Sequence, residues 1–179
     1  LDIIDSSHTS NSHNLYETLK NFLPVLPFYA IHYNLQNCTY PNLTHNLIQT
    51  INNGVALVNY IGHGDPQTWA GEKIIQKSDL ALIHPNEGKL AIWVAGTCSF
   101  GKYYDENSLM EELLIKQDGG IAIIASTEDV SYRENENLLN ALFDEISDYI
   151  QDSNNITEFR IGNILNNAKN ANNNYKFHI

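Results

Sequence analysis

A histidine and a cysteine, each directly after a strongly apolar run, are the residues of this sequence best suited to chemistry. His63 lies between two glycines after the run VALVNYI, and Cys98 follows the run LAIWVAGT. An imidazole can take the proton of a thiol, and backbone amides at a turn favour the thiolate, which is the nucleophilic form. The pattern therefore predicts a nucleophile, Cys98, with His63 as its general base.

The two apolar runs must position these side chains, and they predict neighbouring strands of a parallel sheet. Both are rich in Val, Ile and aromatic residues, which is typical of strands buried on two faces. Ligands and chemistry collect beyond the carboxyl ends of such strands, so we expect His63 and Cys98 side by side at one edge. A third run, 121–126, should bring Thr127 and Glu128 to the same edge, as candidates to line a substrate cleft.

The glycines around the histidine suggest how an oxyanion could be held. Without side chains at Gly62 and Gly64, the backbone can turn sharply and bring N–H groups close to a bound carbonyl. The amides of Gly64 and Cys98 are expected to form an oxyanion hole, in which each donor contributes about 3 kcal/mol in acyl transfer. Trp69 follows closely and is a further candidate to line the cleft, although such a tryptophan more often packs a loop against a sheet.

Other interpretations use the same residues. A zinc site needs three or four ligands, and the only other ligand type nearby is His84, in a different loop before a proline. A phosphate-binding loop would need a Walker lysine or a second glycine pair, and the acidic surroundings oppose an anion. His63 and Cys98 could also have purely structural roles, because a histidine between glycines often shapes a turn and a free cysteine often behaves as a small apolar residue.

The composition limits the class of protein. With 179 residues and 42% hydrophobic content, residues 1–179 suit a single domain with a sizeable core. A net charge of -11 argues against a nucleic-acid partner, and two cysteines do not make a disulfide framework. The sequence starts without Met and has no signal peptide or apolar run long enough to span a membrane, so we expect a piece of a longer protein.

Strand-like and helix-like segments alternate along the chain. Strands are expected at residues 1–5, 28–33, 55–61, 90–97 and 121–126, and helices at 14–23, 43–51, 72–83, 108–114, 138–150 and 159–168. Ser108 and Glu111 have the spacing of a helix-capping box. The alternation predicts an α/β fold with a parallel sheet and right-handed crossovers, without fixing the strand order.

Four motifs together resemble the gingipain family of cysteine peptidases. They are NYIGHG, Trp69-Ala70, VAGTCSFG and SLMEELLIKQDGGIAIIAST, and the resemblance spans about residues 53–143. Within the family the sequence is most similar to the peptidase domain of the type IX secretion sortase. The resemblance implies a caspase-like three-layer α/β sandwich with a mainly parallel sheet, a His63/Cys98 dyad, and an oxyanion hole at Gly64 and Cys98.

The resemblance also implies an activity and a location. Family members cleave protein or peptide substrates through a thioacyl-enzyme, and the sortase passes the acyl group to an amine on lipopolysaccharide. The relatives are bacterial, so we expect a secreted protein, extracellular or on the outer-membrane surface. No cofactor is required, but calcium bound structurally by relatives could occupy loops 103–106 and 128–129.

Some features stay open at this point. The acid that orients the histidine could be Asp5, Asp65, Glu72 or Glu128. The residue that selects the cleavage site has no match. Two other functions remain alternatives: a caspase-like signalling protease of the cytoplasm, and a non-catalytic scaffold module in a larger assembly.

Overall fold

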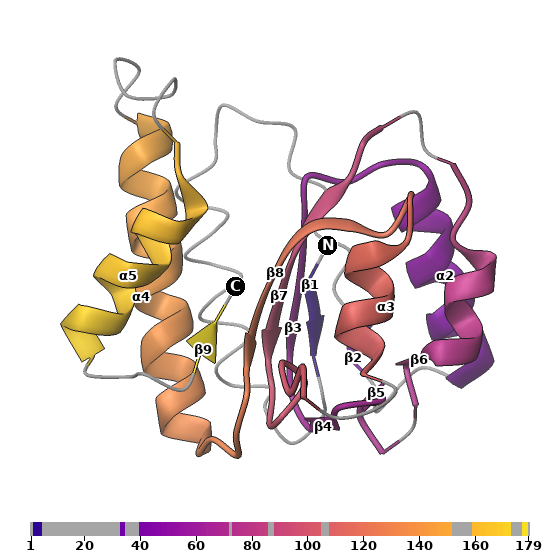
Figure 1. The fold of residues 1–179 in the computed structure, drawn as a ribbon, viewed down its shortest axis with the longest axis horizontal. Coiled ribbons are helices and arrows are strands. Elements are labelled where there is room, and N and C mark those ends of the chain that lie inside the picture. The colour runs from indigo at the N-terminus through magenta and orange to yellow at the C-terminus, as the bar shows by residue number, and fades with distance from the viewer. Residues whose placement is uncertain are drawn as a thin grey trace.

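The fold is a three-layer α/β/α sandwich around one main sheet (Figure 1). The computed structural model describes residues 2–4, 33–34, 40–71, 73–85, 88–104, 108–151, 159–172 and 177–178. Within them the main sheet contains β1 (Asp2–Ile4), β2 (Tyr33–Asn34), β3 (Leu57–Ile61), β7 (Ala91–Gly96), β8 (Gly120–Ser126) and β9 (Phe177–His178). The strand order is β2-β1-β3-β7-β8-β9, and all neighbouring pairs are parallel except β8 and β9. The expected mainly parallel sheet is confirmed.

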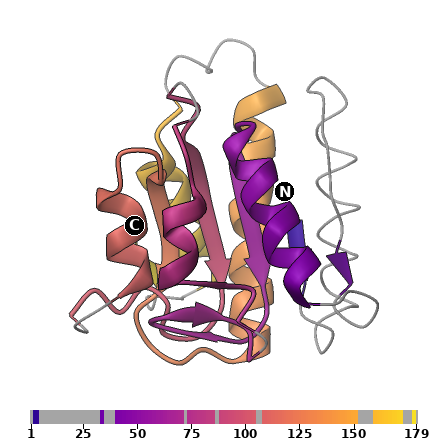
Figure 2. The same ribbon diagram turned by 90° about the vertical axis from the view of Figure 1, so that its right-hand side faces the viewer.

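Helices cover both faces of this sheet (Figures 1 and 2). One face carries α2 (Tyr40–Asn52), the 3-10 helix η3 (Lys77–Leu82) and α3 (Leu109–Ile115), and the other carries α4 (Tyr132–Gln151) and α5 (Ile161–Asn172). Strand side chains alternate between the two: Tyr60 and Trp93 join the α2 and α3 cluster, while Ile61 and Val94 join the α4 and α5 cluster. Because β3, β7 and β8 are buried on both faces, their sequences are nearly continuous apolar runs.

A second, small sheet lies at the carboxyl ends of the main strands (Figure 1). It is antiparallel and contains β4 (Gly64–Asp65), β5 (Thr68–Trp69) and β6 (Ile75–Gln76). The turn between β4 and β5 is held by Asp65 Oδ1, which accepts hydrogen bonds from the N–H groups of Gln67 at 2.7 Å and Thr68 at 2.9 Å. The predicted helix at 72–83 is therefore wrong in its first part, where β6 forms, and its second part is the 3-10 helix η3.

The helix caps differ from the sequence-based expectation. The box predicted at Ser108 does not form: its hydroxyl is buried and finds no hydrogen-bond partner within the described part of the chain. A capping box forms instead at the start of α4, where Ser131 N–H donates to Glu134 Oε2 at 2.6 Å and Glu134 N–H donates to Ser131 Oγ at 3.3 Å. This box fixes where α4 begins, directly after the loop that follows β8.

Several expectations lie outside the described residues. These are the helix at 14–23, most of the strand at 28–33, and Cys38. Among the helices that are described, none has the length and apolar character needed to cross a membrane.

Gly119, at the junction of α3 and β8, offers a test of the fold. A Cβ there would lie 1.9 Å from the carbonyl oxygen of Leu113 and 2.9 Å from its carbonyl carbon. Because backbone atoms cannot move aside cheaply, we expect Gly119→Ala to lower the free energy of unfolding by about 2–3 kcal/mol in urea. Gly162→Ala is the matched control. Its Cβ would meet nothing within 4 Å, so in α5 it should stabilise by about 0.5–1 kcal/mol. A Gly119→Ala variant as stable as wild type would contradict the packing described.

Candidate active site

The register of β3 and β7 brings His63 and Cys98 to the same edge of the sheet. The two strands are neighbours, and their last pair is Ile61 beside Gly96. The pairing continues with a hydrogen bond from Gly62 N–H to Gly96 O at 3.2 Å. His63 and Cys98 each follow the last pair by two residues, on chains that are about 4.8 Å apart in such a sheet. A base and a nucleophile could therefore meet there.

Cys98 lies on the α4 and α5 side of this edge. Ile61 belongs to the apolar cluster of these helices, and Cys98 is partly buried against the same cluster. A Cβ at Gly96 would lie 2.5 Å from Leu139 Cδ1 of α4, so glycine allows this helix to approach the end of β7 closely. His63 is exposed, which leaves its imidazole accessible to substrate and water.

The loop after β8 holds the turn that carries Cys98. Cys98 Sγ lies 3.4 Å from Val130 O, to which the thiol donates a hydrogen bond. Ser99 N–H donates to Glu128 O at 3.0 Å, and Ser99 Oγ donates to Asp129 Oδ1 at 2.8 Å. Ser99 has a φ of 52°, a left-handed conformation that is strained for a residue other than glycine and is found preferentially at functional sites. These contacts between the Cys98 turn and the loop after β8 could not be predicted from the sequence.

Gly64 lies against the residue that precedes the cysteine. A Cβ at Gly64 would be 2.4 Å from Thr97 Oγ1, and the Thr97 side chain is fully buried. Ala70 N–H donates to His63 O at 2.7 Å, so the next pair along the hairpin, Gly64 with Trp69, is of the type without mutual hydrogen bonds. The Gly64 N–H therefore points away from β5, as an oxyanion donor would need. Thr97 was not singled out from the sequence, although its place directly before Cys98 was a signal.

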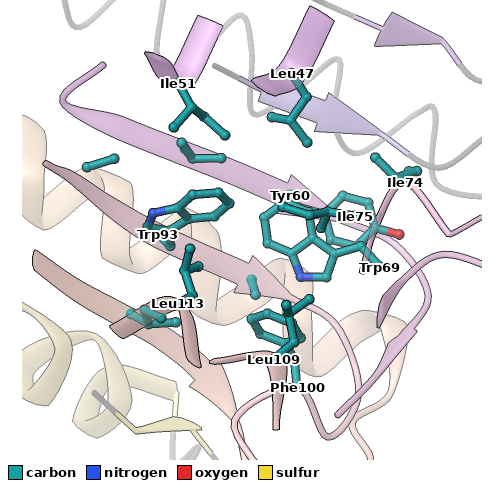
Figure 3. Close-up of a cluster of buried hydrophobic side chains, with 14 of the residues drawn as sticks. Leu47, Ile51, Tyr60, Trp69, Ile74, Ile75, Trp93, Phe100, Leu109 and Leu113 are labelled. Atoms are coloured by element: carbon teal, nitrogen blue, oxygen red, sulfur yellow. The ribbon is translucent and has the colours of Figure 1, made fainter. Parts of the chain in front are cut away.

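Trp69 does not line a cleft, so that prediction is wrong. Its side chain has no exposed surface. The ring stacks on Tyr60 with centroids 4.6 Å apart and an interplanar angle of 12°, and it contacts Trp93 and Phe100, each at 5.5 Å. Figure 3 shows the four rings in one apolar cluster. Pairing of β5 with β4 and β6 turns this side chain inward, where it anchors the small sheet to the main one.

Thr127 and Glu128 follow β8 at the same edge as Cys98. Thr127 is half-buried and Glu128 is exposed. The backbone of Glu128 is fixed on both sides: its carbonyl accepts from Ser99 N–H and from Ser126 Oγ at 2.7 Å, and its N–H donates to Ser126 Oγ at 3.2 Å. Both residues stay candidates to line the cleft.

The acid that would orient the histidine is not singled out by the contacts. Asp65 uses Oδ1 in the hairpin turn. Glu128 is exposed, and Asp5 and Glu72 lie outside the described residues.

A calcium site stays a prediction. Of the two loops considered, only Tyr103, Tyr104, Glu128 and Asp129 are described, and the carboxylate of Asp129 is bonded to Ser99. Over the described ranges, no three or more His, Cys, Asp or Glu side chains gather in a group that could hold a metal ion.

Comparisons with known proteins agree with this architecture. The structure is similar to the crystal structure of the Arg-specific cysteine proteinase gingipain R (RgpB), with a TM-score of 0.72 and 19% identity over 95% of this chain and 41% of that chain. It is also similar to the complex of Porphyromonas gingivalis RgpB pro- and mature domains, with a TM-score of 0.64 and 18% identity over 82% and 37% of the respective chains. The chain thus spans less than half of the length of these proteins. The expected caspase-like fold is confirmed.

The family is settled by sequence. No curated protein matches this sequence. The family model described as peptidase family C25 matches residues 3–178, and the gingipain structures bear out the resemblance to the gingipain family. Because that match spans nearly the whole sequence, the chain belongs to peptidase family C25.

Proposed function

We propose that this domain is a cysteine peptidase that cleaves peptide bonds through a thioacyl-enzyme on Cys98. The observation that carries the proposal is the register of β3 and β7, in which His63 and Cys98 each follow the Ile61–Gly96 pair by two residues. Membership of peptidase family C25 supports the same class of reaction. The exposed histidine and partly exposed cysteine are consistent with access for a peptide.

The reaction begins when the thiol of Cys98 turns away from Val130 O, to which it donates. His63 takes the proton, and the thiolate attacks the carbonyl carbon of the substrate. The negative charge that develops on the carbonyl oxygen rests on the N–H groups of Gly64 and Cys98. His63 then returns the proton to the leaving amine, and the acyl group stays on sulfur as a thioester.

Either water or an amine can resolve the thioester. Attack by water gives a peptidase, and attack by an amine gives a transpeptidase like the type IX secretion sortase that the sequence resembles. The finer proposal is that the domain acts within a larger secreted protein, extracellular or on a bacterial outer-membrane surface. The similarity to a complex of RgpB pro- and mature domains supports the larger context.

Fluorogenic peptides that differ in the residue before the scissile bond test the proposal. The set should include arginine, because gingipain R is described as specific for it. We expect release of the fluorophore for part of the set. Acid-quenched enzyme should carry the acyl mass on the proteolytic fragment that contains Cys98. Adding a dipeptide amine separates the two outcomes, because a transpeptidase yields the ligated product. Absence of both cleavage and adduct across the set would contradict the proposal.

A further inference from the structure

The peptide group between His63 and Gly64 is held at its carbonyl end by two short hydrogen bonds. Tyr60 Oη donates to His63 O at 2.6 Å, and Ala70 N–H donates to the same oxygen at 2.7 Å. The N–H at the other end of this peptide group belongs to Gly64, the proposed oxyanion donor. A side-chain hydroxyl is thus bonded to the peptide group that would stabilise the transition state.

Hydrogen bonds at one end of a peptide group act on the other end. The group is planar, so fixing the direction of its C=O also fixes the direction of its N–H. Hydrogen bonds accepted by the carbonyl also polarise the group and make its N–H a stronger donor. Gly64 needs such support more than another residue would, because glycine has no side chain to restrict its backbone.

Tyr60 is itself held rigidly. Its side chain is fully buried in the α2 and α3 cluster, and its ring is stacked on Trp69 (Figure 3). Trp69 in turn pairs with Gly64 across β4 and β5. The ring stack, the hairpin and the His63–Gly64 peptide group therefore form one connected unit.

We propose that Tyr60 is a positioning residue for the oxyanion hole. Its hydroxyl orients and polarises the Gly64 N–H by donating to the His63 carbonyl, and it does not touch the substrate. The inference rests on the proposed function and adds to it a buried residue that contacts the backbone of His63.

Tyr60→Phe tests the inference, because it removes the hydroxyl and keeps the stacked ring. Three properties should be measured: the steady-state constants for the best peptide, the affinity for the corresponding peptide aldehyde, and the rate at which iodoacetamide alkylates Cys98. The aldehyde forms a thiohemiacetal whose oxygen occupies the oxyanion position, whereas alkylation needs only the thiolate. We expect kcat and aldehyde affinity to fall about tenfold, with KM and alkylation changed less than about twofold.

The control is Tyr149→Phe in α4. The ring of Tyr149 packs against that of Phe159, with centroids 6.2 Å apart. The substitution should leave all of these values unchanged. Wild-type kcat and aldehyde affinity in Tyr60→Phe would overturn the inference. A matching loss of alkylation would also overturn it, because the hydroxyl would then act on the dyad or the fold. The proposed function itself is overturned if the wild-type domain cleaves no peptide and its Cys98 is not alkylated rapidly. Failure of the proposed function can therefore be distinguished from failure of the inference about Tyr60.

Discussion

His63→Ala should reduce peptide cleavage by a factor on the order of 10⁴ or more, and Cys98→Ala should abolish it, because nucleophile and base act as a unit. In the structure the thiol of Cys98 donates to Val130 O, and attack on a carbonyl requires that a base take the proton of the thiol. His63 follows the same strand pair by the same number of residues and is exposed. Without the imidazole, Cys98 becomes an ordinary partly buried thiol.

Alkylation by limiting iodoacetamide near pH 6.5 measures this effect without a substrate. A free cysteine, with a pKa of about 8.5, is almost entirely protonated there and reacts slowly. We expect wild-type Cys98 to be labelled at least about ten times faster than a model thiol, and His63→Ala to remove the difference. The fragment containing Cys38, read in the same mass spectrum, serves as an internal comparison.

His84→Ala is the matched control for the loss of an imidazole. His84 is also exposed and lies in a different loop. Its backbone N–H, which the substitution keeps, donates to Asn52 Oδ1 at 2.9 Å. The substitution should not alter labelling of Cys98. Labelling of Cys98 that is slow in wild type and indifferent to His63 would contradict the dyad and favour the scaffold alternative.

The elements predicted most accurately from sequence are those that are buried on two faces. β3, β7 and β8 form at the apolar runs 55–61, 90–97 and 121–126, because both faces of each strand contact helices and most of their residues are therefore apolar. The strands β4, β5 and β6 have two residues each, too few for any periodic pattern. They form because Asp65 closes the turn between β4 and β5 and because β6 pairs with β5. These contacts depend on the tertiary fold, so local sequence does not predict them.

The candidate site was predictable in its main residues and not in their surroundings. That His63 and Cys98 follow strands could be read from the sequence, but the pairing of Ile61 with Gly96 depends on the strand order, which local patterns do not fix. Trp69 packs against the sheet, the alternative to lining a cleft, and closeness in sequence to a histidine does not determine which way a side chain points. The contacts of Tyr60 and Thr97 depend on the fold of the hairpin, so the partners of these side chains could not be predicted from local sequence patterns.

Gly64→Ala should lower kcat about 100-fold, which is the usual cost of losing one oxyanion donor. A Cβ at this position would lie 2.4 Å from Thr97 Oγ1, 3.1 Å from Thr97 Cγ2 and 3.2 Å from Thr68 O. Thr97 is fully buried and cannot rotate into solvent, so the hairpin must shift. A shift of a few tenths of an ångström moves the N–H of residue 64 away from the oxyanion, while the imidazole and the thiol can still react. Cys98 alkylation should therefore stay near the wild-type rate.

Thr97→Ala should restore part of the activity, because it removes both side-chain atoms that obstruct the new Cβ. The hydroxyl of Thr97 is buried and has no hydrogen-bond partner among the described residues, so its loss costs little stability. We expect the double variant to be about tenfold more active than Gly64→Ala alone, a coupling that separate effects would not produce. Gly71→Ala, whose Cβ would meet nothing within 4 Å, is the control and should behave as wild type. If the double variant is no more active than Gly64→Ala, the contact with Thr97 does not determine the position of the residue 64 N–H, and the glycine is needed for another reason.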